Sequence, residues 1–347
     1  MTELLINGAL WLSVLLFILA GALIAVFGIR MTHLARDLAV ATGLGQAFMG
    51  AVFIGATTSL SGIIASATAA WFGDASLAVS NSLGGIAAQT VFLVVADMIY
   101  RKANLEFAAA SAENLMMSVQ LLLLLCLLNF AFIMPEYSIG AVHPVSIIMV
   151  IVYLYGVRLL ADVHEKPMWL PRLTPGTVRD SRKSPQVGKS RARLRLLYLD
   201  FGVCAAMVGV AGWLAATAGL ALVQRTDVSA GIMGGVFIAI VTSLPELVVA
   251  VTAVRLGALS LAVGDIIGGN AFDTLFVAVA DLFYRDGPIY MAVEIAERVW
   301  LGACLLMVAV LLVGLMYRER KGIANIGLES LLILLLYLFT VGLLTLS

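Results

Sequence analysis

The sequence predicts an all-α membrane protein of about ten transmembrane helices, arranged as two five-helix repeats of inverted topology. Three observations lead to this fold class. The 347-residue chain is 62% hydrophobic and 12% charged, with a mean hydropathy of +1.06, far outside the composition of soluble domains. Apolar stretches of about 20 residues, the length that crosses a bilayer, recur along the chain. A 44-residue stretch of the first half recurs in the second half.

Ten predicted spans are separated by short polar segments. The first follows Met1-Thr2-Glu3, which lacks basic residues, so we expect a spanning helix and not a cleaved signal. Three isolated cysteines, Cys126, Cys204 and Cys304, are expected to be small core residues. The spans lie at 5–29, 43–70, 76–100, 113–134, 141–161, 197–223, 231–254, 260–284, 297–317 and 324–346.

A polar, basic segment joins two membrane regions. Residues 1–161 hold spans one to five, residues 162–196 form the linker, and residues 197–347 hold spans six to ten. The linker has four prolines and a run of Arg and Lys, so we expect it to lie near anionic lipid on the cytoplasmic side. It is too short and too poor in acidic residues for a regulatory ion-binding domain.

Basic residues are distributed unequally between the two sides of the predicted membrane. The odd-numbered loops hold 18 of the 21 Lys and Arg residues, so the positive-inside rule places both termini outside the cytoplasm. Five spans separate span two from span seven, so the two copies of the repeated stretch would cross the membrane in opposite directions. Many secondary transporters are built from such inverted repeats.

The repeated stretch covers residues 58–101 and 242–285. Adding 184 to each residue number, an operation that we call the repeat shift, aligns the two copies without a gap, and 20 of the 44 positions are identical. This is too many for two unrelated apolar hairpins. The identical pairs include Thr58/Thr242, Ser59/Ser243, Gly73/Gly257, Gly84-Gly85/Gly268-Gly269, Asp97/Asp281 and Arg101/Arg285.

A carboxylate lies in the middle of the seventh span. Glu246 follows Pro245, which removes a backbone donor and frees carbonyl groups near Thr242. Freed carbonyls and hydroxyls are suitable ligands for Na⁺ or Ca²⁺, and a carboxylate inside a membrane is costly unless it is used. The alternative is a proline kink in which Glu246 pairs with a neighbouring helix.

A second carboxylate follows a small-residue motif in the eighth span. Asp273 ends the segment Gly268-Gly269-Asn270-Ala271-Phe272-Asp273, whose small residues allow two helices to approach closely. We therefore expect Glu246 and Asp273 to meet near the middle of the membrane. The aligned residues Asn81 and Asp265 are expected to cap helices.

These two motifs resemble those of a known family. Val241–Glu246 followed by Gly268–Asp273 is similar to the second alpha-repeat, near 239–285, of the sodium/calcium exchanger (calcium/cation antiporter) superfamily. Residues near 55–101 resemble the first alpha-repeat. The resemblance implies that the carboxylates Glu246 and Asp273 ligate the transported cation. It implies further ligands at Thr242, Ser243, Thr58, Ser59, Gln89 and Asn270.

The first repeat departs from the family pattern. Ser61-Gly62 aligns with Pro245-Glu246, so the signature Glu is absent, and Gln89 aligns with Asp273. Gly85 and Gly269 stand where the family often has a hydroxyl ligand. If the halves are symmetric, Gly62 faces the site, and Gly62→Glu should raise the affinity for Ca²⁺ relative to Na⁺ or K⁺.

The resemblance implies a secondary active antiporter, not an enzyme, that exchanges Ca²⁺ for Na⁺ or H⁺ by alternating access. We expect it in a bacterial plasma (inner) membrane, with lipid and inorganic cations as partners and with no cofactor or nucleic acid. Two carboxylates leave open a monovalent cation (Na⁺ or K⁺)/H⁺ exchanger, or a transport-inactive scaffold or sensor. An intramembrane protease built on Asp265 and Asp281 is disfavoured, because Asp281 lies at a helix end. The oligomeric state is not defined by the sequence.

The remaining ionisable residues of the spans are expected at helix ends. Residues four apart on a helix can form ion pairs, so Asp97 and Arg101, and likewise Asp281 and Arg285, are expected to pair near the membrane surface. Solvated side chains are expected at His143 and Glu329.

Overall fold

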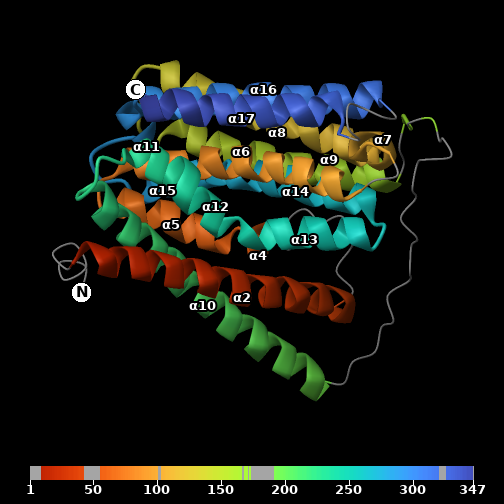
Figure 1. The fold of residues 1–347 in the computed structure, drawn as a ribbon, viewed down its shortest axis with the longest axis horizontal. Coiled ribbons are helices and arrows are strands. Elements are labelled where there is room, and N and C mark those ends of the chain that lie inside the picture. The colour runs from red at the N-terminus through yellow and green to blue at the C-terminus, as the bar shows by residue number, and fades with distance from the viewer. Residues whose placement is uncertain are drawn as a thin grey trace.

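The computed structural model of the chain describes residues 9–42, 55–100, 103–165, 168–170, 172, 191–319 and 326–346. Within these ranges the chain is almost entirely helical and forms no β-sheet, which confirms the predicted all-α class. The helices form a bundle in which α16 and α17 lie along one edge, with α2 and α10 along the opposite edge (Figure 1).

The helices before residue 166 follow the predicted order of spans, with one short addition, α7. They are α2 (Leu10–Thr42), α4 (Gly55–Thr58), α5 (Leu60–Trp71), α6 (Ala75–Ile99), α7 (Leu105–Ala109), α8 (Ala112–Ile133) and α9 (Pro144–Glu165).

The helices after residue 190 include a short π-helix, η2, which is wider than an α-helix, and a short 3-10 helix, η3, which is tighter. In chain order they are α10 (Arg191–Val223), α11 (Ala230–Ile232), η2 (Met233–Ile238), α12 (Ala239–Thr242), α13 (Leu244–Arg255), α14 (Leu259–Asp273), α15 (Leu275–Phe283), η3 (Ile289–Ala292), α16 (Ile295–Tyr317) and α17 (Leu328–Leu346).

The repeat shift relates helices well beyond the aligned stretch. It converts the bounds of α5 into those of α13, and it converts the bounds of α6 into the start of α14 and the end of α15. Helices α7 and η3, α8 and α16, and α9 and α17 begin at matching positions to within one residue. The turns between paired helices also match, because Gly73 and Gly257 both adopt left-handed φ values, +82° and +78°, which glycine tolerates. The five-helix plan is therefore present twice.

Close helix contacts between the halves are reciprocal. A Cβ added to Gly28 of α2 would lie 2.6 Å from Cγ of Pro245, and one added to Gly212 of α10 would lie 2.5 Å from the carbonyl oxygen of Ser61. The repeat shift converts Gly28 into Gly212 and Ser61 into Pro245. Such paired contacts are expected when two similar bodies are related by a two-fold rotation.

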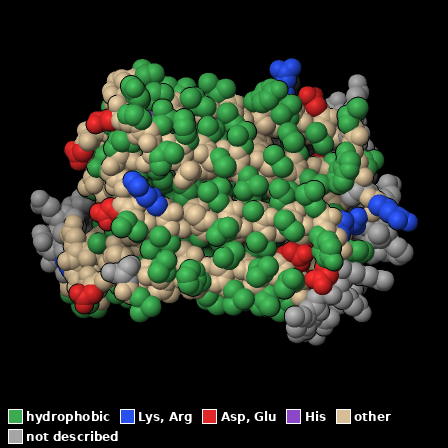
Figure 2. All heavy atoms as spheres, turned by 90° about the horizontal axis from the view of Figure 1, so that it is seen from above, with side chains coloured by type: hydrophobic (Ala, Val, Ile, Leu, Met, Phe, Trp, Pro, Cys, Tyr) green, Lys and Arg blue, Asp and Glu red, His purple; other side chains and the backbone are tan. Residues whose placement is uncertain are grey.

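The outer surface is suited to lipid. In Figure 2 hydrophobic side chains cover the middle of the visible face, and charged side chains lie toward its two ends. Trp11, Ile133 and Phe339 are among the large hydrophobic residues that are more than half exposed. Eight described helices are long and apolar enough to span a membrane, or nine when the bent pair in the second half counts as one span. The protein is an integral, multi-pass membrane protein.

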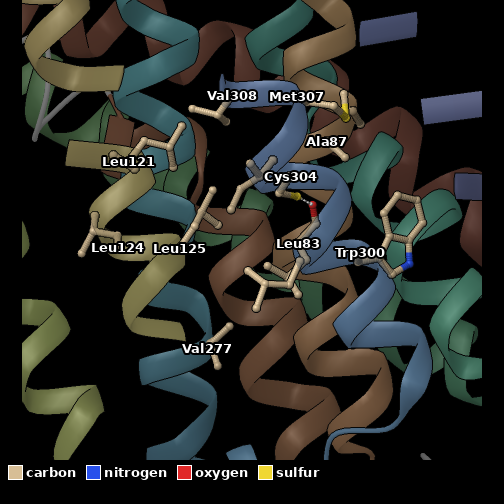
Figure 3. Close-up of a cluster of buried hydrophobic side chains, with 14 of the residues drawn as sticks. Leu83, Ala87, Leu121, Leu124, Leu125, Val277, Trp300, Cys304, Met307 and Val308 are labelled. Atoms are coloured by element: carbon tan, nitrogen blue, oxygen red, sulfur yellow. Dashed lines mark hydrogen bonds between the residues drawn. The ribbon is translucent and has the colours of Figure 1, made fainter. Parts of the chain in front are cut away.

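The interior is packed by apolar side chains from α6, α8 and α16. Figure 3 shows Leu83 of α6 beside Cys304 of α16, whose thiol donates a hydrogen bond to the Leu83 carbonyl at 3.1 Å. Cys204 and Cys304 are buried as expected, but Cys126 is exposed because it lies on the outer face of α8. The prediction of a core position was therefore wrong for Cys126.

The first and second predicted spans differ from the observed helices. Helix α2 continues to Thr42 and does not end near residue 29, because it packs along the equally long α10, with Arg30 at its exposed edge 3.5 Å from Asp200. The second span lies partly outside the described residues, and its described part is the pair α4 and α5. Most of the linker also lies outside the described residues.

Three expectations for the helix ends were wrong. Arg285 does not pair with Asp281 but lies over the ring of Trp71, 5.5 Å from its centroid, while Asp281 is fully buried among backbone donors. His143 is fully buried and Glu329 is 6% exposed. Both lie at helix starts that are covered by the other half, which apolar periodicity does not reveal. Arg101 lies outside the described residues.

Candidate functional site

Two helices are interrupted at equivalent residues in the middle of the bundle. Between α4 and α5 the chain leaves helical geometry at Ser59, with φ −81° and ψ 1°, and between α12 and α13 it does so at Ser243, with φ −96° and ψ 7°. The second break bends the span by 47°. Pro245 fits there because proline is tolerated in the first turn of a helix, where its missing N–H has no partner to lose. The first break forms without a proline.

A buried hydrogen-bond network joins the two breaks. The Ser59 hydroxyl donates to Asp273 Oδ1 at 2.6 Å, and Gln89 Nε2 donates to Asp273 Oδ2 at 2.6 Å and to Ser243 Oγ at 3.1 Å. The contacts Ser59–Asp273 and Ser243–Gln89 exchange under the repeat shift, so the network is itself two-fold related. Four of the predicted site residues therefore meet between α6, α14 and the two breaks.

Glu246 lies in the first turn of α13 and is 2% exposed. Its carboxylate lies near Asp273 and near the Thr58 side chain, whose hydroxyl donates to the Gly55 carbonyl at 3.1 Å. Its Oε2 atom accepts no hydrogen bond from the described residues. The Thr242 hydroxyl does not point toward the site, because it donates to the Ile238 carbonyl at 2.9 Å. The Thr242 carbonyl accepts a hydrogen bond from the Ser61 hydroxyl at 3.1 Å.

Two amide side chains also end in unpaired oxygens at the site. Asn270 is one turn before Asp273 on α14, and its Nδ2 donates to Thr90 Oγ1 at 3.0 Å. In the described part of the chain, Asn270 Oδ1 and Gln89 Oε1 are buried without a hydrogen-bond partner, as is Glu246 Oε2. Buried polar atoms are rarely left unpaired, so three such oxygens beside one network favour a site for a cation or water.

In the described part of the chain, no basic side chain forms a salt bridge with the carboxylates of the site. Among the described residues the recorded salt bridge is Arg30–Asp200, at the exposed edge of α2 and α10. Glu246 and Asp273 are both almost fully buried. Burying two carboxylates is strongly unfavourable unless they are neutralised. This burial favours neutralisation by a bound cation or a proton.

Some polar residues around the site were missed by sequence reasoning. The Ser82 hydroxyl donates to the Asp273 carbonyl at 2.7 Å. Ser61 donates to the Thr242 carbonyl, and Thr90 accepts from the Asn270 amide. The available signal is the spacing on α6: Ser82 and Gln89 are two turns apart along one face of an otherwise apolar helix.

Three small or polar positions of α6 and α14 border the network without ligating. A Cβ added to Gly85 would lie 3.8 Å from Asp273 Oδ2, and one added to Gly269 would lie 3.4 Å from Gln89 Oε1. Both glycines therefore face the site, as expected, and supply no hydroxyl. Asn81 lies well inside α6 and donates to the Gly62 carbonyl at 3.1 Å, so the prediction that it caps a helix was wrong.

Gly62, the counterpart of Glu246, does not face open space. An added Cβ would lie 2.9 Å from Cζ of Phe276 and closer still to Cε2, so the phenyl ring fills the place of the missing side chain. Phe276 is held in turn by Phe272, with ring centroids 6.5 Å apart. The expectation that Gly62 projects freely into the site was wrong, because sequence symmetry does not reveal which neighbour fills a gap.

We expect Gly62→Glu alone to destabilise the protein, since overpacking typically costs about 1–3 kcal/mol. The double variant Gly62→Glu/Phe276→Ala should recover stability because the ring is removed. It should also bind Ca²⁺ more tightly relative to Na⁺ or K⁺ than Phe276→Ala alone, because a third carboxylate suits a divalent ion. Thermal unfolding and ion competition measure the two effects. Equal stability of Gly62→Glu and the unmodified protein would contradict the packing.

Two broken helices that bring carboxylates together inside inverted repeats define the architecture of a secondary transporter. The sequence model of the family described as "Sodium/calcium exchanger protein" matches residues 12–160 and 196–346. The chain belongs to this family.

Individual relatives agree with this family assignment. The chain is 24% identical over 275 residues to CaxA of Alkalimonas amylolytica, a candidate antiporter, covering 79% of this chain and 82% of that protein. The sodium-calcium exchanger NCX_Mj has a similar fold, with a TM-score of 0.60, 18% identity, and coverage of 96% of this chain and 99% of that one. The H⁺/Ca²⁺ exchanger CAX gives a TM-score of 0.71 at 11% identity, covering 96% and 84%.

Proposed function

We propose that the protein is a secondary active cation antiporter whose transported ion binds between Glu246 and Asp273. The observation that carries this proposal is the two-fold related network at the helix breaks, with two buried carboxylates and three buried oxygens that lack partners. No residue is required to form or break a covalent bond, so the activity is transport and not catalysis.

In this proposal the residues have distinct roles. Glu246 is the principal ligand, because one of its carboxylate oxygens is unpaired. Asp273 supplies the second charge, and its two oxygens are oriented by Ser59 and Gln89. The Thr58 and Ser243 hydroxyls, the Thr242 carbonyl and the oxygens of Gln89 and Asn270 complete a set of hard oxygen ligands of the kind that Na⁺ and Ca²⁺ prefer.

Ca²⁺ exchanged for Na⁺ or H⁺ is the form of the proposal that the relatives support. NCX_Mj is a sodium-calcium exchanger and CAX an H⁺/Ca²⁺ exchanger. Two carboxylates are enough to neutralise one Ca²⁺ ion. After Ca²⁺ is released, binding of Na⁺ or H⁺ to the same carboxylates would allow the site to open again to the opposite side of the membrane. Rocking of one repeat against the other around a fixed site is the usual mechanism of such transporters.

A monovalent cation/H⁺ exchanger is the second candidate. The first half supplies no carboxylate, and Phe276 occupies the space beside Gly62, so the site has less charge and fewer ligands than Ca²⁺ normally uses. A transport-inactive scaffold or sensor is disfavoured because Glu246 and Asp273 are both retained in one network.

Flux in proteoliposomes with imposed Na⁺ and pH gradients tests the proposal. We expect uptake of ⁴⁵Ca²⁺ that depends on an outward gradient of Na⁺ or H⁺ and stops when the gradient is collapsed by an ionophore. Uptake of ²²Na⁺ or ⁸⁶Rb⁺ driven by the pH gradient, without Ca²⁺ uptake, would instead identify the monovalent exchanger. Absence of flux for every ion would contradict antiport.

We also propose that the protein lies in a bacterial plasma membrane and that both of its termini lie outside the cytoplasm. The orientation is supported by the 18 of 21 basic residues that fall in the odd-numbered loops. Cysteines introduced at Ser184, which is outside the described residues, and at Gly287 should react with an impermeant reagent from opposite sides. The exposed native Cys126 is replaced by Ser in both variants. Labelling of both positions from one side would contradict the orientation.

A further inference from the structure

Asp97 forms a junction between the two halves at one end of the bundle. It is fully buried at the end of α6, and its oxygens accept hydrogen bonds from the backbone N–H of Leu105 at 2.7 Å and of Gly327 at 3.1 Å. One carboxylate therefore fixes the start of α7 and the start of α17. We call this the first junction.

Asp281 forms a second junction at the equivalent place in the other half. It accepts from the backbone N–H of Ile289 at 2.9 Å and of His143 at 2.8 Å. The repeat shift relates these partners to those of the first junction, so the same structure is built twice. A single buried aspartate is sufficient for it.

A serine near each aspartate shows where the junctions differ. In the second junction the Ser146 hydroxyl lies 2.7 Å from Asp281 Oδ2 and 2.7 Å from the Tyr290 hydroxyl. In the first junction the equivalent Ser330 hydroxyl donates to Oε1 of Glu106 at 3.1 Å. Glu106 therefore replaces Tyr290, and a carboxylate replaces a neutral group.

A second replacement adds another carboxylate. Glu329 is the counterpart of Val145 under the repeat shift, and both are buried, with exposures of 6% and 2%. The first junction thus holds the carboxylates of Asp97, Glu106 and Glu329 where the second holds one. Because the second junction forms without the additional acids, the architecture of the junction does not require them.

The two additional carboxylates turn unpaired oxygens toward one point. Neither Glu106 Oε2 nor Glu329 Oε2 has a hydrogen-bond partner among the described residues. A Cβ added to Gly327 would lie 3.1 Å from Glu329 Oε2 and 3.4 Å from Glu106 Oε2, so both oxygens border the same space. Asn104 Nδ2 lies 3.3 Å from the same point and donates a hydrogen bond to the Glu319 carbonyl at 2.9 Å. The Glu329 side chain packs directly against Gly314 of α16, where a Cβ would lie 2.6 Å from Glu329 Cγ.

The helices around this point supply no neutralising charge. Helices α6, α7, α14 and α17 contain no Lys, Arg or His, and the one such residue of α16, Arg298, lies in its first turn, at the opposite end of that helix from Gly314. Arg318 donates to the carbonyls of Phe107 at 3.0 Å and Arg172 at 2.6 Å and lies over the Phe107 ring, while Glu319 adds negative charge beside Glu329. The sequence neighbours Arg101, Lys102, Arg320 and Lys321 lie outside the described residues.

We propose that Glu106 and Glu329 form a proton-binding site, separate from Glu246 and Asp273, in which one proton is shared between the two unpaired oxygens. Taking up a proton from water reduces the pair from two negative charges to one and makes one carboxyl a donor to the other. Losing it leaves two like charges in a buried space and pushes α17 away from α7. A groove of about 410 Å³ between α16 and α17 is lined by Glu319 and Glu329 and otherwise mainly by apolar side chains such as Leu306 and Leu332.

The pH dependence follows from the environment of Glu106. Burial, with a contribution from Asp97, raises the pKa of Glu106 to about 8. The folded state therefore keeps a proton that the unfolded chain has lost, between the ordinary carboxyl pKa of about 4.3 and about pH 8. Stability should fall as pH rises through this interval and should not fall further above it.

The experiment compares thermal unfolding of the full-length protein between about pH 5 and pH 9 with that of Glu106→Gln and Glu329→Gln, in buffers without metal ions. In each variant the decrease in Tm should be smaller than in the unmodified protein, because only the contribution of Glu246 and Asp273 remains, so that at high pH the variant unfolds at least about 3 °C higher. Because one proton is shared, the double variant should add nothing to either single variant. Infrared spectra at neutral pH should show a protonated carboxyl band that either substitution weakens.

Several outcomes would overturn the site. Unchanged pH dependence in both variants, or an unchanged carboxyl band, would contradict it. Restoration of Tm at high pH by Na⁺, K⁺ or Ca²⁺ in the unmodified protein but not in Glu329→Gln would show that a metal ion binds instead of a proton. The exposed Glu136→Gln is the control for loss of one acid. If Glu106→Gln or Glu329→Gln fails to fold, Glu329→Val is used in its place, because Val is the residue that the second junction has at the equivalent position.

Discussion

Replacing Glu246 with Gln should abolish cation transport while the protein remains folded. Glutamine keeps the size of the side chain and an oxygen that can accept a hydrogen bond, and it removes one of the two charges that hold the cation. Loss of one partner of a buried charge pair costs about 3–5 kcal/mol, which corresponds to binding weaker by roughly a hundredfold or more. Flux in proteoliposomes should fall to the level of protein-free vesicles.

The control for this variant is Glu136→Gln, which removes an exposed carboxylate between α8 and α9. It should transport as the unmodified protein does. In buffer without added cations, size-exclusion profiles should match in all three proteins and neither variant should have a lower Tm, since removing an unpaired buried charge does not weaken the fold. Wild-type flux in Glu246→Gln would rule out the assignment of Glu246 as principal ligand.

The second large effect is expected at Gly84, where α6 crosses η2. An added Cβ would overlap the carbonyl group and Cα of Gly235. Neither backbone can move without shifting a helix, so Gly84→Ala should be destabilised by more than about 3 kcal/mol, above the usual range for overpacking. The expected result is a large decrease in Tm and in the yield of monodisperse protein.

Gly302→Ala on α16 is the matched control, because an added Cβ there meets nothing within 4 Å. Alanine is the better helix former by about 1 kcal/mol, so this variant should be as stable as the unmodified protein or slightly more stable. If Gly84→Ala and Gly302→Ala have the same Tm, the close crossing of α6 and η2 is contradicted.

Most of the fold could be predicted from the sequence because the membrane imposes simple rules. Span length, the distribution of charges and the internal repeat together give the helices and their pairing. Helix ends were predicted less well. Helix α2 continues past Arg30 because it packs on α10, and packing against a distant helix leaves no local signal. The π-helix η2 and the short helices α7 and η3 were missed for the same reason.

The site was predicted to the extent that its residues belong to the repeated motifs. Ser59, Ser243, Gln89 and Asp273 form one network, and Glu246 lies beside it. The sequence did not predict that Phe276 fills the space at Gly62, because the alignment shows which residue is missing and not which neighbour replaces it. The carboxylates of the first junction were also missed, because Glu106 and Glu329 belong to opposite halves of the chain and come together only where the start of α17 packs beside α7.

The most direct test of the central claim is the stabilisation of purified protein by cations. A ligand that binds only the folded state adds about 2.7 kcal/mol of stability at a concentration of about 100 times its Kd. We predict that Ca²⁺ or a monovalent cation raises the Tm of the unmodified protein in a concentration-dependent manner, and that the increase is lost in Glu246→Gln and in Asp273→Asn. The same increase in either variant would show that the cation binds elsewhere and would contradict the proposed site.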